Sequence, residues 1–162
     1  MCTFYGFIVD AEAEVLSHGP NLTTPVVRRL EFIGDSDTCA FGNEGESSSS
    51  KNFFKMKGRM ENSYNGFAAI LSRQFEAEAH ILAWSGKGIH SNTLDWGPTM
   101  RTLWKRTLAS REGEWEMTSW VPDAVVIHIG GNDLLPPSSL ETEVIEGYTK
   151  LLDDVRAGNR FL

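Results

Sequence analysis

The sequence has few cysteines and no excess of positive charge, and each shortage excludes a class of protein. Its 162 residues include two cysteines, Cys2 and Cys39, which lack the spacing of a metal site and are too few to predict a disulfide framework. Lys and Arg number 15 against 22 Asp and Glu, which gives a net charge of −7. Because no basic cluster is present, we exclude DNA and RNA as partners.

Long apolar runs are also absent. No run approaches the roughly 20 residues that a membrane span requires, so we expect no membrane insertion. The first residues, Met1 to Tyr5, show neither the basic region nor the apolar region of a signal peptide. The length is that of one ordinary globular domain, and no feature predicts an oligomeric state.

Three short apolar segments alternate with helical patterns. The segments 29–34, 79–84 and 124–129 predict buried strands, and the stretches from 62, from 98 and from 138 predict helices. Strand, helix, strand, helix, strand, helix is the order typical of a parallel sheet with helices on its faces. The sequence therefore predicts the α/β class.

Apolar spacing and capping residues define the three expected helices. The first has an N-cap at Asn62, the second opens at Pro98, and the third follows a capping box at 138–141 and ends at Gly158. Their predicted apolar faces are Tyr64, Phe67, Ala68, Leu71 and Phe75; Met100, Leu103 and Trp104; and Leu140, Val144, Ile145, Tyr148, Leu151, Leu152 and Val155.

Outside these elements the composition is that of connections. Residues 3–9 alternate weakly like an edge strand, 10–27 have the composition of a linker, and 42–50 form a low-complexity loop rich in Gly, Glu and Ser. The chain stops directly after a helix, where a further strand is expected.

Each predicted strand ends in a residue suited to acyl transfer. Ser36 follows the first strand, Gly86 the second and Asn132 the third. The carboxyl ends of parallel strands share one edge of a sheet, which is where such folds bind ligands. Acyl transfer needs a nucleophile beside donors that stabilise the developing oxyanion. Ser36 offers a hydroxyl and a backbone N–H, Gly86 a backbone N–H, and Asn132 a side-chain amide.

The histidines and tryptophans suggest secondary roles. We expect His128 to be a core residue packed against a helix, and Trp84 and Trp104 to be packing residues as well. Trp96 follows Gly86 and is the best tryptophan for stacking on a sugar ring. His90 lies in the same loop and is favoured as a loop residue that could line the cleft.

A competing interpretation uses Asp35 and Asp37. The segment Asp35-Ser36-Asp37-Thr38 is similar to the Asp-x-Asp-x-Thr loop of haloacid dehalogenase-type phosphatases, in which Asp35 would be the nucleophile, Asp37 the acid/base and Mg²⁺ the cofactor. It leaves Gly86 and Asn132 without a role, so we favour acyl transfer.

The motifs together resemble the SGNH hydrolases, also called GDSL esterases. Gly34-Asp35-Ser36, Gly86 and 130–133 resemble three blocks of that family, and 31–36, 42–45, 61–64 and 84–88 are similar to carbohydrate esterase family 2. The resemblance implies a flavodoxin-like three-layer α/β/α domain and a secreted enzyme that removes acetyl groups from plant polysaccharides. It implies Ser36 as nucleophile, Gly86 and Asn132 as the oxyanion hole, and no cofactor or metal.

The resemblance also implies a division into two domains. Residues 1–27 match the end of a β-sandwich plus linker, and 28–162 match part of the SGNH hydrolase domain. The sequence differs from the family pattern in two ways. Asp37 stands where the family has an apolar residue, and a carboxylate there disfavours an oxyanion. No histidine follows His128, so the family's Asp-x-x-His block has no counterpart. We expect residues 1–162 alone to be a poor esterase, and a catalytically inactive carbohydrate-binding fragment stays open as an alternative.

Overall fold

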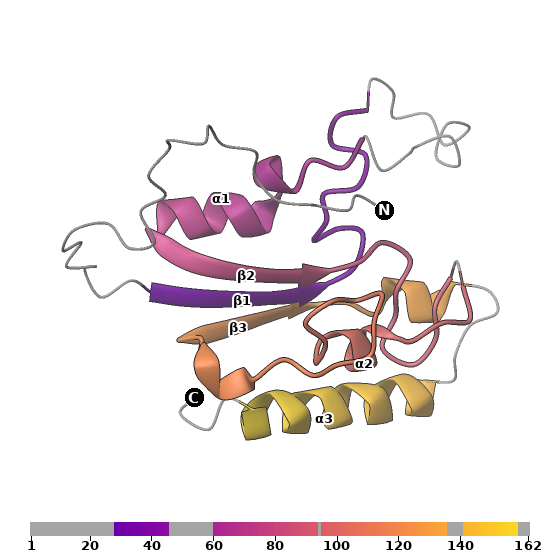
Figure 1. Ribbon diagram of the computed structural model, residues 1–162. Helices are drawn as coiled ribbons and strands as arrows, with labels where there is room; N and C mark the ends of the chain where they lie inside the picture. Colours follow the sequence, from indigo (N-terminus) through magenta and orange to yellow (C-terminus); the bar gives the residue numbers. More distant parts are fainter. Residues whose placement is uncertain (1–27, 46–59, 94, 136–140, 159–162) are drawn as a thin grey trace, which may run out of the picture.

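The chain folds around one small parallel sheet. Figure 1 shows the computed structural model, which describes residues 28–45, 60–93, 95–135 and 141–158. The strands are β1 (Arg28–Gly34), β2 (Ala77–Ala83) and β3 (Ala124–His128), in the spatial order β2-β1-β3. Both strand pairs are parallel, so the predicted α/β class is confirmed.

Helices cover the two faces of the sheet. In Figure 1, α1 (Phe67–Gln74) lies on one side of the strands, and α2 (Met100–Leu103) and α3 (Glu141–Gly158) lie on the other. Side chains alternate along β1, because successive residues of a strand point to opposite faces. Phe32 therefore contacts Phe67 of α1, with ring centroids 6.0 Å apart, while Ile33 joins the core on the α3 side. The predicted three layers are confirmed.

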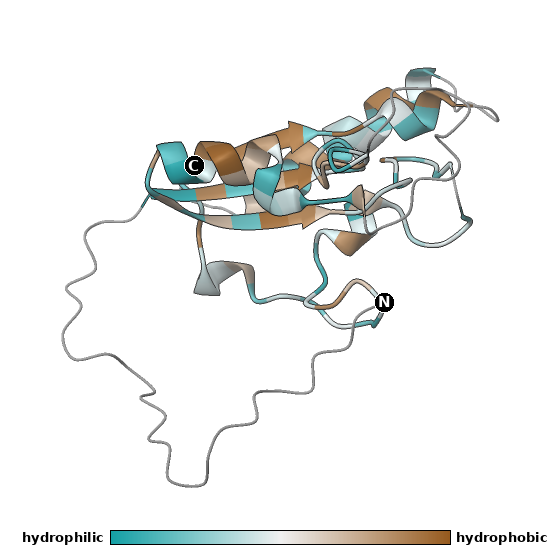
Figure 2. Ribbon diagram, turned by 90° about the horizontal axis from the view of Figure 1, so that it is seen from above, coloured by the Kyte–Doolittle hydropathy of each residue, from teal (hydrophilic) through white to brown (hydrophobic). Residues whose placement is uncertain are grey.

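The main core lies between the sheet, α2 and α3. Its buried members are Ile33, Ile89, Met100, Leu103, Trp104, Ile129, Leu151 and Val155. Figure 2 shows hydrophobic residues along the strands and into their arrowheads, with hydrophilic ones gathered mainly where the strands begin. Trp104 is 2% exposed, which confirms it as a packing residue, whereas Trp84 is 39% exposed and the prediction that it packs in the core is wrong.

The first helix differs from its prediction. A 3₁₀ turn spans Ser63–Asn65, and Gly66 then adopts an extended conformation, so α1 begins only at Phe67. Asn62 forms no cap, because its side chain donates to Glu44 instead. The break at Gly66 turns Tyr64 away from the α1 face, and this side chain is exposed.

Some residues of the predicted apolar helix faces are exposed and do not pack in the core. Phe75 lies just beyond α1 and is 51% exposed. On α3, Leu151 and Val155 are buried, but Ile145 and Leu152 are exposed because they lie outside the stripe that faces the sheet. Helix α3 ends at Gly158 as predicted.

Some predictions fall on other parts of the chain. The strand at 3–9, the linker at 10–27, the capping residues 138–140 and most of the 42–50 loop lie outside the described residues. The proposed domain boundary after residue 27 therefore stays a prediction. Among the described helices, none combines the length and the apolar character needed to cross a bilayer.

The core predicts a contrast between two neighbouring leucines of α3. Leu151 is fully buried, whereas Leu152 is 38% exposed. We expect Leu151→Ala to lower the free energy of unfolding by about 2–5 kcal/mol, since a buried cavity remains. Leu152→Ala removes the same atoms from the same helix and should cost about 1 kcal/mol or less. Urea unfolding followed by circular dichroism measures both, and equal losses would contradict this packing.

Candidate active site

The carboxyl ends of the strands bring the predicted site residues to one edge. Gly34, the last residue of β1, is in register with Ala83 of β2 and with His128 of β3. The chain then turns tightly, since the backbone N–H of Phe41 donates to the carbonyl of Ser36 at 2.8 Å. Ser36 lies half-buried at the start of this turn.

Asn132 ties the three strand ends together. It is 9% exposed and lies in the 3₁₀ helix η5 (Gly131–Leu134). Its amide nitrogen donates to the carbonyl of Lys87 at 2.9 Å and to the Asp35 carboxylate at 3.2 Å. Its amide oxygen accepts from the Thr93 hydroxyl at 2.9 Å. Asn132 therefore contacts the residue before Ser36 and the residue after Gly86.

Gly86 has the conformation that a glycine allows. It is buried, and its φ of 83° lies in the left-handed region. Its carbonyl accepts the N–H of Thr93 at 3.0 Å. Within the described ranges, no residue accepts a hydrogen bond from the Gly86 N–H.

Asp133 holds the loop that follows Gly86. The residue is fully buried, and its carboxylate accepts the backbone N–H groups of Ile89, His90 and Ser91 at 2.9, 2.7 and 2.9 Å. A Cβ on Gly88 would lie 2.5 Å from this carboxylate, so only glycine permits the close approach. No pattern in the sequence predicts this role of Asp133.

A second carboxylate orders the next part of the loop. Asp95 pairs with Lys87 at 2.8 Å and accepts the N–H of Gly97, also at 2.8 Å. The hydrogen bond from Lys87 lowers the pKa of Asp95, and Lys87 itself is only 3% exposed. Trp96, between these anchors, is 99% exposed. The sequence analysis also missed the roles of Lys87 and Thr93.

The loop borders a cavity that is lined by both predicted substrate-binding residues, His90 and Trp96. Its volume is about 370 Å³, and its lining is His90, Ser91, Asn92, Thr93, Asp95, Trp96, Gly97 and Thr99. The His90 imidazole lies 3.6 Å from the Glu143 carboxylate of α3. The cavity adjoins Asn132 through Thr93.

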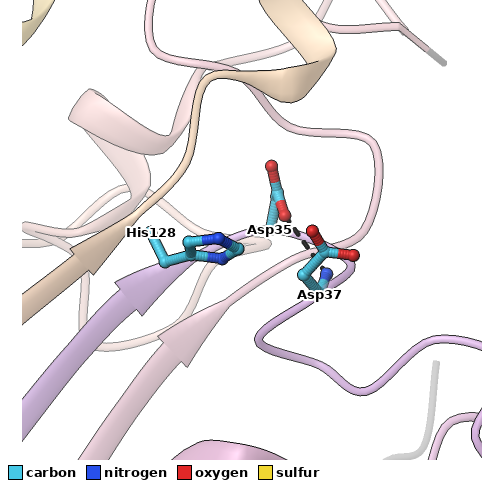
Figure 3. A group of neighbouring side chains, drawn as sticks. All are labelled: Asp35, Asp37 and His128. Carbon is cyan, nitrogen blue, oxygen red and sulfur yellow. Dashed lines mark hydrogen bonds between the residues drawn. The ribbon is translucent and has the colours of Figure 1, made fainter.

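His128 does not occupy the core position that the sequence predicted. Its ring does contact Phe67 of α1 edge-on, with centroids 5.8 Å apart, but the side chain is exposed because it stands at the open end of β3. Figure 3 shows its imidazole pointing toward the carboxylates of Asp35 and Asp37. Burial raises the pKa of Asp35, and the hydrogen bonds from Asp37 and Asn132 offset part of that effect.

The fold and these strand ends agree with a known family. The model of the GDSL-like lipase/acylhydrolase family matches residues 32–160, and the chain belongs to this family. The resemblance predicted from the motifs is therefore confirmed.

Several relatives are carbohydrate esterases. The chain is 38% identical over 136 residues to the cellulase/esterase CelE of Acetivibrio thermocellus, an alignment that covers 82% of this chain and 16% of CelE. It is 27% identical over 170 residues to an acetylxylan esterase/glucomannan deacetylase of Cellvibrio japonicus, covering 96% of this chain and 45% of the relative.

A solved structure shows the same fold. It is a family two carbohydrate esterase from Clostridium thermocellum in complex with cellohexaose, with a TM-score of 0.77 and 35% identity over 88% of this chain and 42% of that chain. The chain thus spans less than half the length of these relatives.

The three hydrogen bonds to Asp133 predict a large effect of a small change. Asp133→Asn keeps the size of the side chain but removes its charge and directs an amide against backbone N–H groups. Since hydrogen bonds to charged groups contribute about 1.5–3 kcal/mol each, we expect unfolding to become easier by about 3 kcal/mol or more. Asp153 is an exposed carboxylate on α3, so Asp153→Asn is the matched control. Its free energy of unfolding should stay within about 0.5 kcal/mol of the native value. Similar denaturation midpoints for both variants would contradict the role of Asp133.

Proposed function

We propose that this chain carries the nucleophile and oxyanion hole of a carbohydrate O-acetyl esterase. The observation that supports it is the hydrogen-bonded connection of Asn132 to Asp35 and Lys87, the neighbours of Ser36 and Gly86. Ser36, Gly86 and Asn132 each follow the carboxyl end of a strand of the same parallel sheet, which supports their assignment to one site. Membership of an acylhydrolase family agrees with this chemistry.

The reaction divides into two acyl transfers. The Ser36 hydroxyl attacks the acetyl carbonyl, its proton passes to a base, and the sugar hydroxyl leaves as the acetyl-Ser36 ester forms. Water then attacks that ester and releases acetate and Ser36. Ser36 needs an adjacent base for this, because a serine hydroxyl is a weak nucleophile at its ordinary pKa. In the family, that base comes from the Asp-x-x-His block.

The oxyanion receives hydrogen bonds from the N–H groups of Ser36 and Gly86 and from the Asn132 amide. Both hydrogens of that amide already have acceptors. The longer bond, at 3.2 Å to Asp35, is the one that a substrate oxygen would share or displace. The Thr93 hydroxyl keeps the amide in the same orientation throughout. Such preorganised donors supply much of the rate of acyl transfer.

The cavity beside Asn132 is suited to a sugar. Trp96 presents a flat apolar surface, and His90, Asn92 and Asp95 supply polar groups around it. An aromatic ring can cover the apolar face of a sugar, while the polar groups can hydrogen-bond to its hydroxyls. The relatives named for acetylxylan, glucomannan and cellohexaose support an acetylated polysaccharide as substrate and a secreted protein.

The phosphatase interpretation has less support. It would make Asp35 a nucleophile, but the carboxylate of Asp35 is buried and already accepts hydrogen bonds from Asp37 and Asn132. It also leaves Gly86 unused, and the relatives named above are esterases.

If Asn132 is the oxyanion donor, its removal should lower turnover selectively. In a protein that joins this chain to an Asp-x-x-His block, we expect Asn132→Ala to lower kcat for p-nitrophenyl acetate by roughly a hundredfold or more. Ser36→Ala should abolish the reaction, and Asp153→Asn should leave it unchanged. Unchanged turnover in Asn132→Ala would remove this residue from the site. Turnover that survives Ser36→Ala would overturn the esterase proposal, and binding of oligosaccharide without turnover would support the inactive carbohydrate-binding alternative.

A further inference from the structure

Two carboxylates and an imidazole meet beside Ser36. Asp35 and Asp37 flank the serine in the turn after β1, and His128 ends the neighbouring strand β3. One potential ligand atom from each residue lies within 4.8 Å of the other two. Figure 3 shows the His128 ring directed toward the turn that carries Asp35 and Asp37.

In the described part of the chain, the two carboxylates of this cluster form no ion pair with a lysine or an arginine. Asp35 is 5% exposed, and a buried carboxylate is costly without compensation. The imidazole of His128 lies beside both carboxylates.

Asp37 places a second carboxylate directly after Ser36. A second carboxylate next to the nucleophile repels the negative charge that develops during acyl transfer. A divalent cation bound by Asp35 and Asp37 would bring the local charge from about −2 to about zero. Such an ion would therefore offset the repulsion.

We propose that Asp35, Asp37 and His128 form a binding site for one divalent transition-metal ion. One oxygen from each carboxylate and one ring nitrogen of His128 are its ligands, and water fills the open positions. The mixed oxygen and nitrogen set suits Mn²⁺ or Zn²⁺, whereas Mg²⁺ prefers oxygen ligands. The benefit of the ion to acyl transfer rests on the proposed esterase function, whereas its binding to the three side chains can be measured without that function.

Hydrogen bonds already orient the buried ligand. One oxygen of Asp35 accepts the N–H of Asp37 at 3.2 Å, and the other accepts the amide of Asn132 at 3.2 Å. Each carboxylate oxygen has a further lone pair for a metal. Such outer hydrogen bonds fix the direction of metal ligands and support their affinity. Asp37 and His128 are exposed, so an ion can reach the site from solvent.

Titration of the 162-residue chain with Mn²⁺ tests the site. Mn²⁺ favours carboxylate oxygen over thiolate, so the cysteines do not compete for it. We expect the free-ion electron paramagnetic resonance signal to report one bound Mn²⁺ per chain. Asp37→Asn and His128→Gln each remove a ligand. We expect each to lower the affinity for Mn²⁺ at least roughly tenfold, because loss of a residue that only supports a metal ligand already costs about that much.

Two exposed residues elsewhere provide matched controls. Asp153→Asn removes one carboxylate charge and His90→Gln removes one imidazole, and both variants should bind Mn²⁺ like the native chain. Absence of stoichiometric binding by the native chain would overturn the proposal. Equal binding by the native chain and by His128→Gln would also overturn it, because His128 would then not be a ligand of the ion. Circular dichroism shows whether each variant is folded, and His128→Asn replaces His128→Gln if the latter is not.

Discussion

The site depends most on the carboxylate of Asp133. This side chain reaches from the end of β3 to the loop after β2 and accepts three successive N–H groups there. A short loop with unsatisfied N–H groups would otherwise be costly to bury. By taking all three, Asp133 fixes the loop on the sheet edge and so fixes Gly86 and Lys87 in front of Asn132.

The same loop connects the chemistry to the cavity. Lys87 has two roles, since its carbonyl accepts from Asn132 while its ammonium group pairs with Asp95. Asp95 and the Asn92 amide hold the segment that carries Trp96. Asn132 and the exposed aromatic surface of Trp96 are therefore positioned by one continuous set of hydrogen bonds, which is the arrangement that a precise site requires.

Local patterns predicted the strands and the residues at their ends, because strand burial and turn chemistry are written in neighbouring residues. Ser36 and Asn132 could be placed at one edge from strand order alone. The role of Asp133 could not be predicted, because its partners are backbone N–H groups some 40 residues earlier in the chain, and any sequence can supply those. His128 was misplaced for a related reason. Period-two alternation indicates which face of the sheet a side chain lies on, but not whether a helix covers that part of the face.

The central claim is that Ser36 is the residue that takes the acyl group, and covalent labelling tests it most directly. A fluorophosphonate reacts with an activated serine and leaves a stable adduct that peptide mass spectrometry can locate. In a protein that joins this chain to an Asp-x-x-His block, the account predicts one adduct per chain, on Ser36, and slower labelling in Asn132→Ala because the oxyanion donor is lost. An active protein whose adduct lies on another residue, or that hydrolyses esters without forming one, would contradict it.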